Sequence, residues 1–323
     1  MKTPVFWYRP SGFVSTLLAP LSLLYMAGRI VDVLLSRPQP FGANVIVVGN
    51  AVAGGAGKTP TTLALAKILR DRQVAAQIVT RGYGGSEAGP RRLKSDDTAA
   101  LVGDEALLLA NAAPVWVACN RALGIGCALS AGADAVLLDD GLQNPKIMAG
   151  TNILVIDGES GLGNGQMLPA GPLREPFVAI RDRIAAVVLI GEDRQNIARL
   201  LDGVPVFHAA LSVDATGLRG RYAAFTGLAR PAKFFASARG ANLDVVATRD
   251  FPDHHLYSVA ERASLRDWAR AHNARLLTTA KDAVRWPVEE RGELAVLPLT
   301  LTFTDEDAVA NFLMKRIHPH VIP

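Results

Sequence analysis

A glycine-rich loop constrains what this chain can fold into more than any other feature of its sequence. Residues 44–48 form a short apolar run typical of a buried strand, and residues 61–72 have the apolar spacing of a helix. The segment between them contains Gly54-Gly55-Ala56-Gly57-Lys58-Thr59. Glycines let backbone N–H groups turn toward phosphate oxygens, and the N-terminus of the following helix favours negative charge. The pattern predicts a strand–loop–helix unit that holds the phosphates of a nucleoside triphosphate.

The loop matches known phosphate-binding motifs only in part. In the standard motif G-x-x-x-x-G-K-[ST], the first glycine would stand at Val52. The spacing resembles the variant G-G-x-G-K-[ST] of the MinD and ParA ATPases, which carry a signature lysine where this chain has Ala53. Lys58 is expected to reach the β- and γ-phosphates, and Thr59 to offer its hydroxyl to Mg²⁺. Pro60 suits the first helical turn, where its missing N–H costs nothing.

A pair of carboxylates follows another predicted strand. Residues 135–138 are apolar and lead into Asp139-Asp140-Gly141, which places the carboxylates at the end of a strand where ligands of open α/β sheets bind. Such a triplet is also a common turn, but the loop upstream favours a metal site. Asp139 is expected to hold Mg²⁺ directly or through water, and Asp140 to support it or hold a second ion. The guanine-reading motif [NT]-K-x-D is not matched by residues 278–282, where Lys and Asp are adjacent, so ATP is favoured over GTP.

Strand and helix patterns alternate along most of the chain. This alternation predicts an α/β fold: a P-loop NTPase-like, mostly parallel sheet with helices on both faces. The pattern restarts near residue 221, which predicts a second, smaller α/β unit whose last strand lies within 294–303. The expected division is an N-terminal apolar helical segment at 1–40, a P-loop kinase core domain at 41–219 and a smaller C-terminal α/β domain at 220–323.

The N-terminal segment is unusually apolar. Residues 12–35 contain few charges, are interrupted by Pro20, and have the basic neighbours Arg9, Arg29 and Arg37. An apolar segment with basic flanks is typical of a helix in the headgroup region of a membrane. The alternative is a helix packed on the protein's own core, and the sequence leaves both open. A helix that crosses the membrane is the least favoured of the three.

The composition limits the classes of ligand and partner that the chain is expected to bind. The chain has 323 residues, a net charge of +4 and a pI near 9.2, which suits a phosphorylated ligand or an anionic membrane surface. It has no run of Lys and Arg interleaved with aromatic residues, so no nucleic-acid partner is expected. Cys119 and Cys127 fit neither a zinc motif nor a disulfide framework, which indicates a cytosolic or cytosol-facing protein.

Several further blocks resemble the tetraacyldisaccharide 4′-kinase family, and they occur in that family's order between about residue 47 and residue 285. The blocks are Val48-Gly49-Asn50 with the phosphate loop, Arg81-Gly82-Tyr83-Gly84, Gly103-Asp104-Glu105, Asp139-Asp140-Gly141-Leu142-Gln143, Asn164-Gly165 with residues 168–176, Phe251-Pro252-Asp253-His254-His255, and Lys281-Asp282. The resemblance implies an ATP- and Mg²⁺-dependent kinase that phosphorylates the 4′-hydroxyl of a tetraacyl glucosamine disaccharide 1-phosphate in lipid A biosynthesis. It also implies two α/β/α domains with the active site in the cleft between them. The enzyme is expected to act at the cytoplasmic face of the inner membrane. The lipid-linked disaccharide is the expected partner, with membrane contact through the N-terminal segment and no obligate protein partner.

The resemblance also assigns roles to residues. Asp104 is expected to take the proton of the sugar hydroxyl, His254 to pair with it from the second domain, and Lys58 to act on the phosphates. The remaining roles are nucleotide contacts at Asn50, Gly54, Gly55, Ala56, Gly57, Lys58, Thr59 and Pro60; metal contacts at Thr59, Asp139, Asp140 and Glu105; and substrate contacts at Arg81, Tyr83, Arg121, Gln143, Asn144, Arg174 and Glu175.

Some of these residues have simpler interpretations. The family commonly has His where this chain has Asn144, and Asn forms hydrogen bonds but does not titrate near neutral pH. Asp104 and Glu105 open an apolar helix, where acidic residues are favoured by the helix dipole alone. His254 could belong to a polar turn, and Arg174 with Glu175 could be a surface ion pair.

Two other functions are compatible with the loop. One is a MinD-like ATPase that cycles on membranes through partner binding, although Ala53 and the Pro/Gly-rich block at 168–176 argue against it. The other is a P-loop kinase of a soluble metabolite, whose N-terminal helix would pack on its own core. Incubation with γ-labelled ATP and a lipid extract distinguishes the lipid kinase from the switch. The lipid kinase transfers the label to a glycolipid, whereas the switch releases it only as free phosphate.

Overall fold

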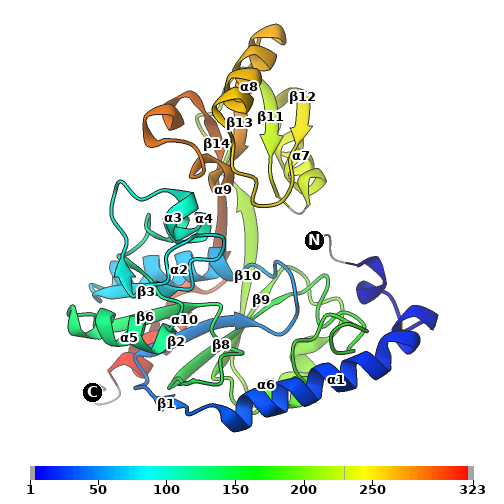
Figure 1. The fold of residues 1–323 in the computed structure, drawn as a ribbon, viewed down its shortest axis with the longest axis vertical. Helices are drawn as coiled ribbons and strands as arrows, with labels where there is room; N and C mark the ends of the chain where they lie inside the picture. The colour runs from blue at the N-terminus through cyan, green and yellow to red at the C-terminus, as the bar shows by residue number, and fades with distance from the viewer. Residues whose placement is uncertain (1–3, 229, 319–323) are drawn as a thin grey trace.

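A nine-stranded sheet forms the larger unit of the computed structural model, which describes residues 4–228 and 230–318 (Figure 1). The strand order is β15-β10-β9-β8-β2-β6-β3-β5-β4, and every pairing is parallel except the two at the edges, β15 with β10 and β4 with β5. The strands are β2 (Val45–Asn50), β3 (Ala76–Thr80), β4 (Arg91–Arg92), β5 (Val115–Val117), β6 (Ala135–Asp139), β8 (Thr151–Asp157), β9 (Ala186–Ile190), β10 (Val206–Val213) and β15 (Leu299–Phe303). Two short segments, β1 (Gln39–Pro40) and β7 (Ile147–Met148), pair separately.

Helices cover both faces of this sheet because its central strands are apolar on both sides. All residues of β2, β3, β6 and β9 are buried, as expected for parallel strands between two helical layers. One face packs against α2 (Lys58–Asp71), α3 (Ala99–Val102), α4 (Asp104–Leu109) and α10 (Glu306–Ile317). The other packs against α5 (Arg121–Ser130), α6 (Phe177–Arg181) and η2 (Ile197–Leu201). The predicted fold class, a mostly parallel P-loop-type sheet between helices, is confirmed.

A second, all-parallel sheet lies above the first in Figure 1. Its order is β12-β11-β13-β14, with β11 (Arg221–Thr226), β12 (Asp244–Asp250), β13 (Arg275–Thr279) and β14 (Ala295–Leu297). One face packs on α8 (Val259–Ala271) and α9 (Ala280–Ala283), the other on α7 (Pro231–Gly240), and η3 (Val288–Glu293) precedes β14. Ser258 caps the N-terminus of α8 and forms a complete capping box with Glu261.

The chain returns to the larger unit before it ends, which the sequence did not predict. The segment 294–303 was expected to lie wholly in the smaller unit, and this is wrong for β15, which pairs antiparallel with β10. Leu301 and Phe303 are buried in the core of the large sheet, and α10 packs against α2. The apolar run looks continuous in sequence, but Pro298 separates β14 from β15. The described residues after 298 therefore belong with the nine-stranded sheet.

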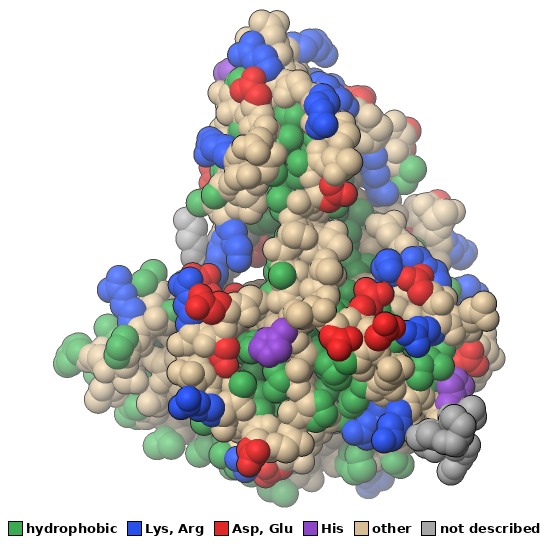
Figure 2. Space-filling view, turned by 180° about the vertical axis from the view of Figure 1, so that it is seen from behind, with side chains coloured by type: hydrophobic (Ala, Val, Ile, Leu, Met, Phe, Trp, Pro, Cys, Tyr) green, Lys and Arg blue, Asp and Glu red, His purple; other side chains and the backbone are tan. Residues whose placement is uncertain are grey.

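The N-terminal segment forms η1 (Val5–Tyr8) and a long helix, α1 (Phe13–Leu35), that runs along the outside of the large unit (Figure 1). Its only buried residues are Ser15 and Ser22, whereas apolar side chains such as Leu17, Leu24 and Leu35 are 67%, 70% and 80% exposed. This rules out the alternative that α1 packs its apolar side chains on the protein's own core. In Figure 2, apolar side chains lie at the surface at the lower left, the side on which α1 runs. By length and composition alone α1 could also cross a membrane.

Candidate active site

The glycine-rich loop joins β2 to α2, as predicted. Gly57 ends the loop in the left-handed backbone region, at φ +85°, and a Cβ there would lie 2.4 Å from Cδ1 of Ile190. Glycine is therefore required both by backbone conformation and by space. Helix α2 begins at Lys58, whose Nζ donates to Oδ1 of Asn50 at 3.2 Å and lies 3.8 Å from Oδ1 of Asp140. The lysine is thus already directed toward the carboxyl ends of the strands.

Asp139 stands at the carboxyl end of β6 and is 2% exposed. Its Oδ1 accepts a hydrogen bond of 2.9 Å from the hydroxyl of Thr62 in α2. Burial, followed by the nearby charge of Glu105, raises the pKa of Asp139 to about 7. A desolvated carboxylate of this kind is stabilised in its ionised form by a cation.

Asp140 has the opposite character. Burial alone would raise its pKa, but the charges of Lys58, Arg174 and Arg121 outweigh burial and lower it. Arg174 Nη1 lies 3.2 Å from Oδ1 of Asp140 and donates to Oε1 of Gln143 at 3.3 Å. Gln143 in turn donates from Nε2 to the backbone carbonyl of Asn50 at 2.7 Å. The structure therefore joins five predicted site residues into one polar cluster beside the loop: Asn50, Lys58, Asp140, Gln143 and Arg174.

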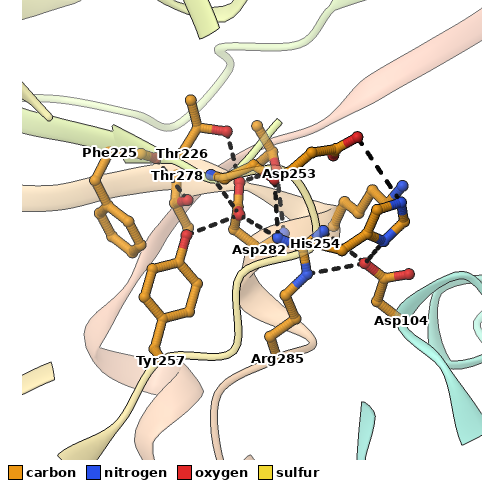
Figure 3. A network of polar contacts seen from close by, with 12 residues as sticks. Asp104, Phe225, Thr226, Asp253, His254, Tyr257, Thr278, Asp282 and Arg285 are labelled. Atoms are coloured by element: carbon orange, nitrogen blue, oxygen red, sulfur yellow. Dashed lines mark hydrogen bonds and ion pairs between the residues drawn. The ribbon is translucent and has the colours of Figure 1, made fainter. Parts of the chain in front are cut away.

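Asp104, the first residue of α4, is the centre of a second cluster (Figure 3). The preceding Gly103 has φ +84°, and a Cβ there would lie 2.5 Å from the carbonyl oxygen of Tyr83, so the Arg81–Gly84 block packs closely against this turn. Asp104 is 4% exposed, and its Oδ2 contacts Nδ1 of His254 at 3.0 Å. The predicted pairing of Asp104 with a histidine from the smaller unit is therefore present in the geometry.

Arg285 completes this cluster, and the sequence prediction missed it. Its Nε and Nη2 donate to Oδ2 of Asp104 at 2.8 and 2.5 Å, and its Nη1 donates to Oδ1 of Asp282 at 2.9 Å. Beside it, Lys281 Nζ donates to Oε1 of Glu105 at 3.1 Å. The Lys281-Asp282 block was a signal for this region, because Arg285 lies one turn further along and faces the same way.

The protonation state of Asp104 follows from these contacts. Burial alone would raise its pKa, but the hydrogen bond from His254 and the charges of Lys281 and Arg285 outweigh burial and hold the pKa at about 2. Its second oxygen, Oδ1, is buried and has no hydrogen-bond partner within the described residues. Asp104 is therefore an ionised carboxylate: Oδ2 has three hydrogen-bond contacts, whereas the buried Oδ1 has none within the described residues.

Three of the predicted substrate residues lie around these clusters. Tyr83 is 63% exposed and sets its ring edge-on to His254, with ring centres 5.4 Å apart. Arg121 is the first residue of α5; its burial lowers its pKa, and its charge interacts with those of Asp140, Arg81 and Asp139. The positive charge of Arg121 therefore acts on the two carboxylates at the end of β6.

Two other predicted substrate residues have structural partners instead. Glu175 is 7% exposed and accepts a 2.5 Å contact from Nη2 of Arg183, which also donates to the carbonyl of Leu142 at 2.9 Å. Arg183 thus links the buried Glu175 to the Leu142 turn, and the predicted substrate contact of Glu175 stays a prediction. Asn144 uses Oδ1 to accept from the backbone N–H of Lys146 at 3.1 Å, which closes a local turn.

No preformed metal cage exists among residues 4–228 and 230–318, because no group of three or more His, Cys, Asp or Glu side chains converges there. Mg²⁺ is commonly bound by one or two carboxylates together with substrate phosphates and water, rather than by an all-protein cage. Asp139 is the last residue of β6, Asp140 follows it, and Thr59 is in the first turn of α2. Glu105, the fourth predicted metal residue, is paired with Lys281.

The comparisons with known proteins agree with one another. The family described as Tetraacyldisaccharide-1-P 4'-kinase matches residues 14–318. The tetraacyldisaccharide 4'-kinase of Rhodospirillum centenum is 45% identical over 97% of this chain and 96% of its own, and that of Paramagnetospirillum magneticum is 43% identical over 98% and 99%. The crystal structure of LpxK from Aquifex aeolicus in complex with ATP aligns with a TM-score of 0.77 and 24% identity, covering 94% of this chain and all of that chain. This last match supports the fold.

Proposed function

The chain belongs to the tetraacyldisaccharide 4′-kinase family, and we propose that its two polar clusters supply the two halves of one phosphoryl transfer. The protein is an ATP-dependent kinase that phosphorylates the 4′-hydroxyl of a tetraacyl glucosamine disaccharide 1-phosphate in lipid A biosynthesis. Family membership decides against both the MinD-like switch and the kinase of a soluble metabolite. The observation that supports the assignment of residues is the contact between Asp104 and His254, which joins the larger unit to the smaller one.

The phosphate half consists of the loop and its lysine. Gly54, Gly55, Ala56 and Gly57 present backbone N–H groups, Lys58 neutralises charge on the transferred phosphoryl group, and Asn50 orients that lysine through its Oδ1. Thr59 and Pro60 begin α2, whose N-terminal dipole adds to the attraction. Arg174 and Arg121 add positive charge on the side of Asp140.

Mg²⁺ fits the two carboxylates at the end of β6. Asp139, Asp140 and the hydroxyl of Thr59 would hold it, and when bound it neutralises charge on the phosphate oxygens. The protein's own contribution is to present Asp139 in a fixed orientation, since Thr62 bonds its Oδ1 at 2.9 Å. Glu105 pairs with Lys281, and its negative charge contributes to the raised pKa of Asp139.

The acceptor half consists of Asp104 and His254. The sugar hydroxyl attacks the γ-phosphorus: its O–H bond breaks as the new O–P bond forms, the proton goes to Asp104, and ADP leaves with the electrons of the broken P–O bond. His254 donates from Nδ1 to the carboxylate and stabilises its charge. Tyr83 orients the imidazole ring through their edge-on contact. Arg81 and Arg121 would meet the anionic groups of the substrates.

Helix α1 is the proposed membrane contact. Most of its large apolar side chains are exposed, whereas the polar residues Ser15 and Ser22 are buried against the protein, which is the reverse of a soluble surface helix. Since the acceptor is a lipid, this orientation would bring the kinase to the surface in which its substrate lies. We place the protein at the cytoplasmic face of the inner membrane, where ATP and the lipid acceptor meet.

Incubation with γ-labelled ATP and the tetraacyl disaccharide 1-phosphate tests these assignments. Wild-type protein should label the lipid, and Asp104→Asn should lose at least ~10²-fold in kcat because the general base is removed. Lys58→Ala should lose a comparable factor in kcat, because the charge on the transferred phosphoryl group is no longer neutralised. Turnover that survives Asp104→Asn would contradict the base assignment, while failure of the wild-type protein to label the lipid would contradict the substrate.

A further inference from the structure

One arginine holds both members of the Asp104–His254 pair. The side chain of Arg285 is fully buried, at 0% exposed, and donates from Nε and Nη2 to a single oxygen of Asp104, Oδ2, at 2.8 and 2.5 Å (Figure 3). Its Nη1 donates to the carbonyl of Gly227 at 3.0 Å. The backbone N–H of His254 donates to that same carbonyl at 3.2 Å. Arg285 therefore contacts the carboxylate directly and the histidine's turn through one shared carbonyl.

Arg285 is itself held rigidly by Asp282. Nη1 donates to Oδ1 of Asp282 at 2.9 Å, and the Asp282 side chain is fully buried. Four further donors fix this carboxylate: the hydroxyls of Thr226, Tyr257 and Thr279, and the backbone N–H of Gly227. Because a guanidinium is a planar fork, anchoring Nη1 fixes the directions in which Nε and Nη2 point. The position of Oδ2 of Asp104 is thus set by the smaller unit.

The two oxygens of Asp104 are used unequally. Oδ2 receives two contacts from Arg285 and one from His254, whereas Oδ1 is buried without a hydrogen-bond partner in the part of the chain that the structure describes. Buried oxygens of an ionised carboxylate are almost always paired, so an unpaired one indicates a donor that comes from outside the chain. In the proposed reaction that donor is the hydroxyl of the sugar.

We propose that Arg285 is a positioning residue for the transfer: by occupying Oδ2 of Asp104 it reserves Oδ1 for the acceptor hydroxyl. This inference rests on the proposed function, in which Asp104 receives the proton. Arg285 does not touch the substrate, and it acts through the orientation of Asp104 and of the turn that carries His254. Lysine cannot replace it, because a single ammonium group cannot reach Asp104, Asp282 and Gly227 in the fork geometry.

The test compares Arg285→Lys and Arg285→Ala with Arg291→Ala, using the full chain and the lipid acceptor. Arg291 is a matched control, because its guanidinium donates to the backbone carbonyls of Val284 and Trp286 in the same unit and does not contact Asp104. We expect Arg285→Ala to lose ~10²-fold in kcat and Arg285→Lys ~10-fold or more, with the KM for ATP within about twofold of wild type. Millimolar guanidinium should restore part of the turnover of Arg285→Ala, and Arg291→Ala should keep near-normal kcat and gain nothing.

A double variant isolates the route of the effect. If Arg285 acts through Asp104, then Asp104→Asn with Arg285→Lys will be no slower than Asp104→Asn alone. Near-normal kcat in both Arg285 variants, or a double variant slower by the product of the two single losses, would overturn the inference. Should Arg285→Ala fail to fold, Arg285→Lys and the double variant decide the question. Full turnover in Asp104→Asn would instead overturn the base assignment of the proposed function, and the inference with it.

Discussion

The hydroxyl of Tyr25, on the apolar helix α1, donates a 3.2 Å hydrogen bond to the backbone carbonyl of Arg174. The guanidinium of Arg174 contacts Asp140, so a residue of the proposed membrane helix bonds to the backbone that carries part of the phosphate site. Further along α1, Nη2 of Arg29 donates to the carbonyl of Gln143 at 3.0 Å. Helix α1 therefore supports the site from behind while its apolar side faces outward.

The inward side of α1 should matter for turnover. Ser22 Oγ donates to the carbonyl of Met167 and accepts from the buried N–H of Ala170, so Ser22→Ala leaves buried backbone groups unpaired at a cost of ~1–3 kcal/mol. Together with Tyr25→Phe, it should lower kcat several-fold by loosening the segment before Arg174. Vesicle sedimentation should stay normal, since the apolar side is unchanged. Unaltered kinetics in the double variant would contradict this coupling.

The outward side of α1 should matter for membrane binding. Leu17→Ser with Leu24→Ser removes two exposed apolar side chains, each contributing ~1.5 kcal/mol or more when buried in lipid, and should weaken partition to anionic vesicles by roughly 10²-fold. Turnover on acceptor dispersed in detergent should stay near wild type. Flotation with vesicles measures the first quantity, and undiminished flotation would show that α1 is not the membrane contact.

Asp104 should make stability depend on acid pH. Its pKa of about 2 in the folded protein lies below the ordinary 3.8, so ionised Asp104 stabilises the folded state by ~2 kcal/mol above pH 4. That contribution is lost as pH falls from about 4 through 2. The difference in unfolding free energy between wild type and Asp104→Asn, from urea titrations, should therefore shrink over this interval. Asp96→Asn removes the same charge at an exposed position and serves as the control; equal pH dependence in both variants would contradict the prediction.

Asp139 should make the metal requirement depend on pH near neutrality. With a pKa of about 7, Asp139 takes up a proton below that pH, and a divalent cation must displace that proton to bind. The Mg²⁺ concentration that gives half-maximal rate should rise as pH falls from 8 to 6, by up to ~10-fold per unit below 7. Asp139→Asn should need more Mg²⁺ throughout and lose this slope, and chelation should abolish turnover. A midpoint independent of pH in the wild-type protein would rule out Asp139 as a ligand.

Much of the phosphate site could be predicted because parallel strands end at one edge of a sheet. The loop follows β2 and the carboxylates stand at the end of β6, and these two strands are hydrogen-bonded neighbours, so Lys58 and Asp140 had to lie close together. The family resemblance added the pairing of Asp104 with His254. Without it, the local pattern would describe Asp104 as the start of a helix and His254 as part of a polar turn. That contact joins two units and depends on how they are arranged.

Other features needed the structure. Arg285 acts through side-chain geometry across the two units, and nothing in its spacing distinguishes it from Arg291. The orientation of α1 did leave a signal: Ser15, Ser22 and Arg29 recur every seven residues, which places them along one side of a helix. Average hydropathy hides that stripe, and so the sequence could not choose between a buried helix and a membrane-facing one.

The pairing of β10 with β15 has a consequence for synthesis. These two strands form an antiparallel pair at the sheet edge, and the segment that connects them contains the entire smaller unit. A growing chain emerges with its N-terminal part first, so the smaller unit is complete before the edge strand that closes the larger one exists. The larger sheet therefore stays incomplete until β15 has been synthesised, and until then β10 is an unpaired edge strand. A nascent chain halted before residue 299 would therefore carry a finished small unit on an unfinished, aggregation-prone sheet.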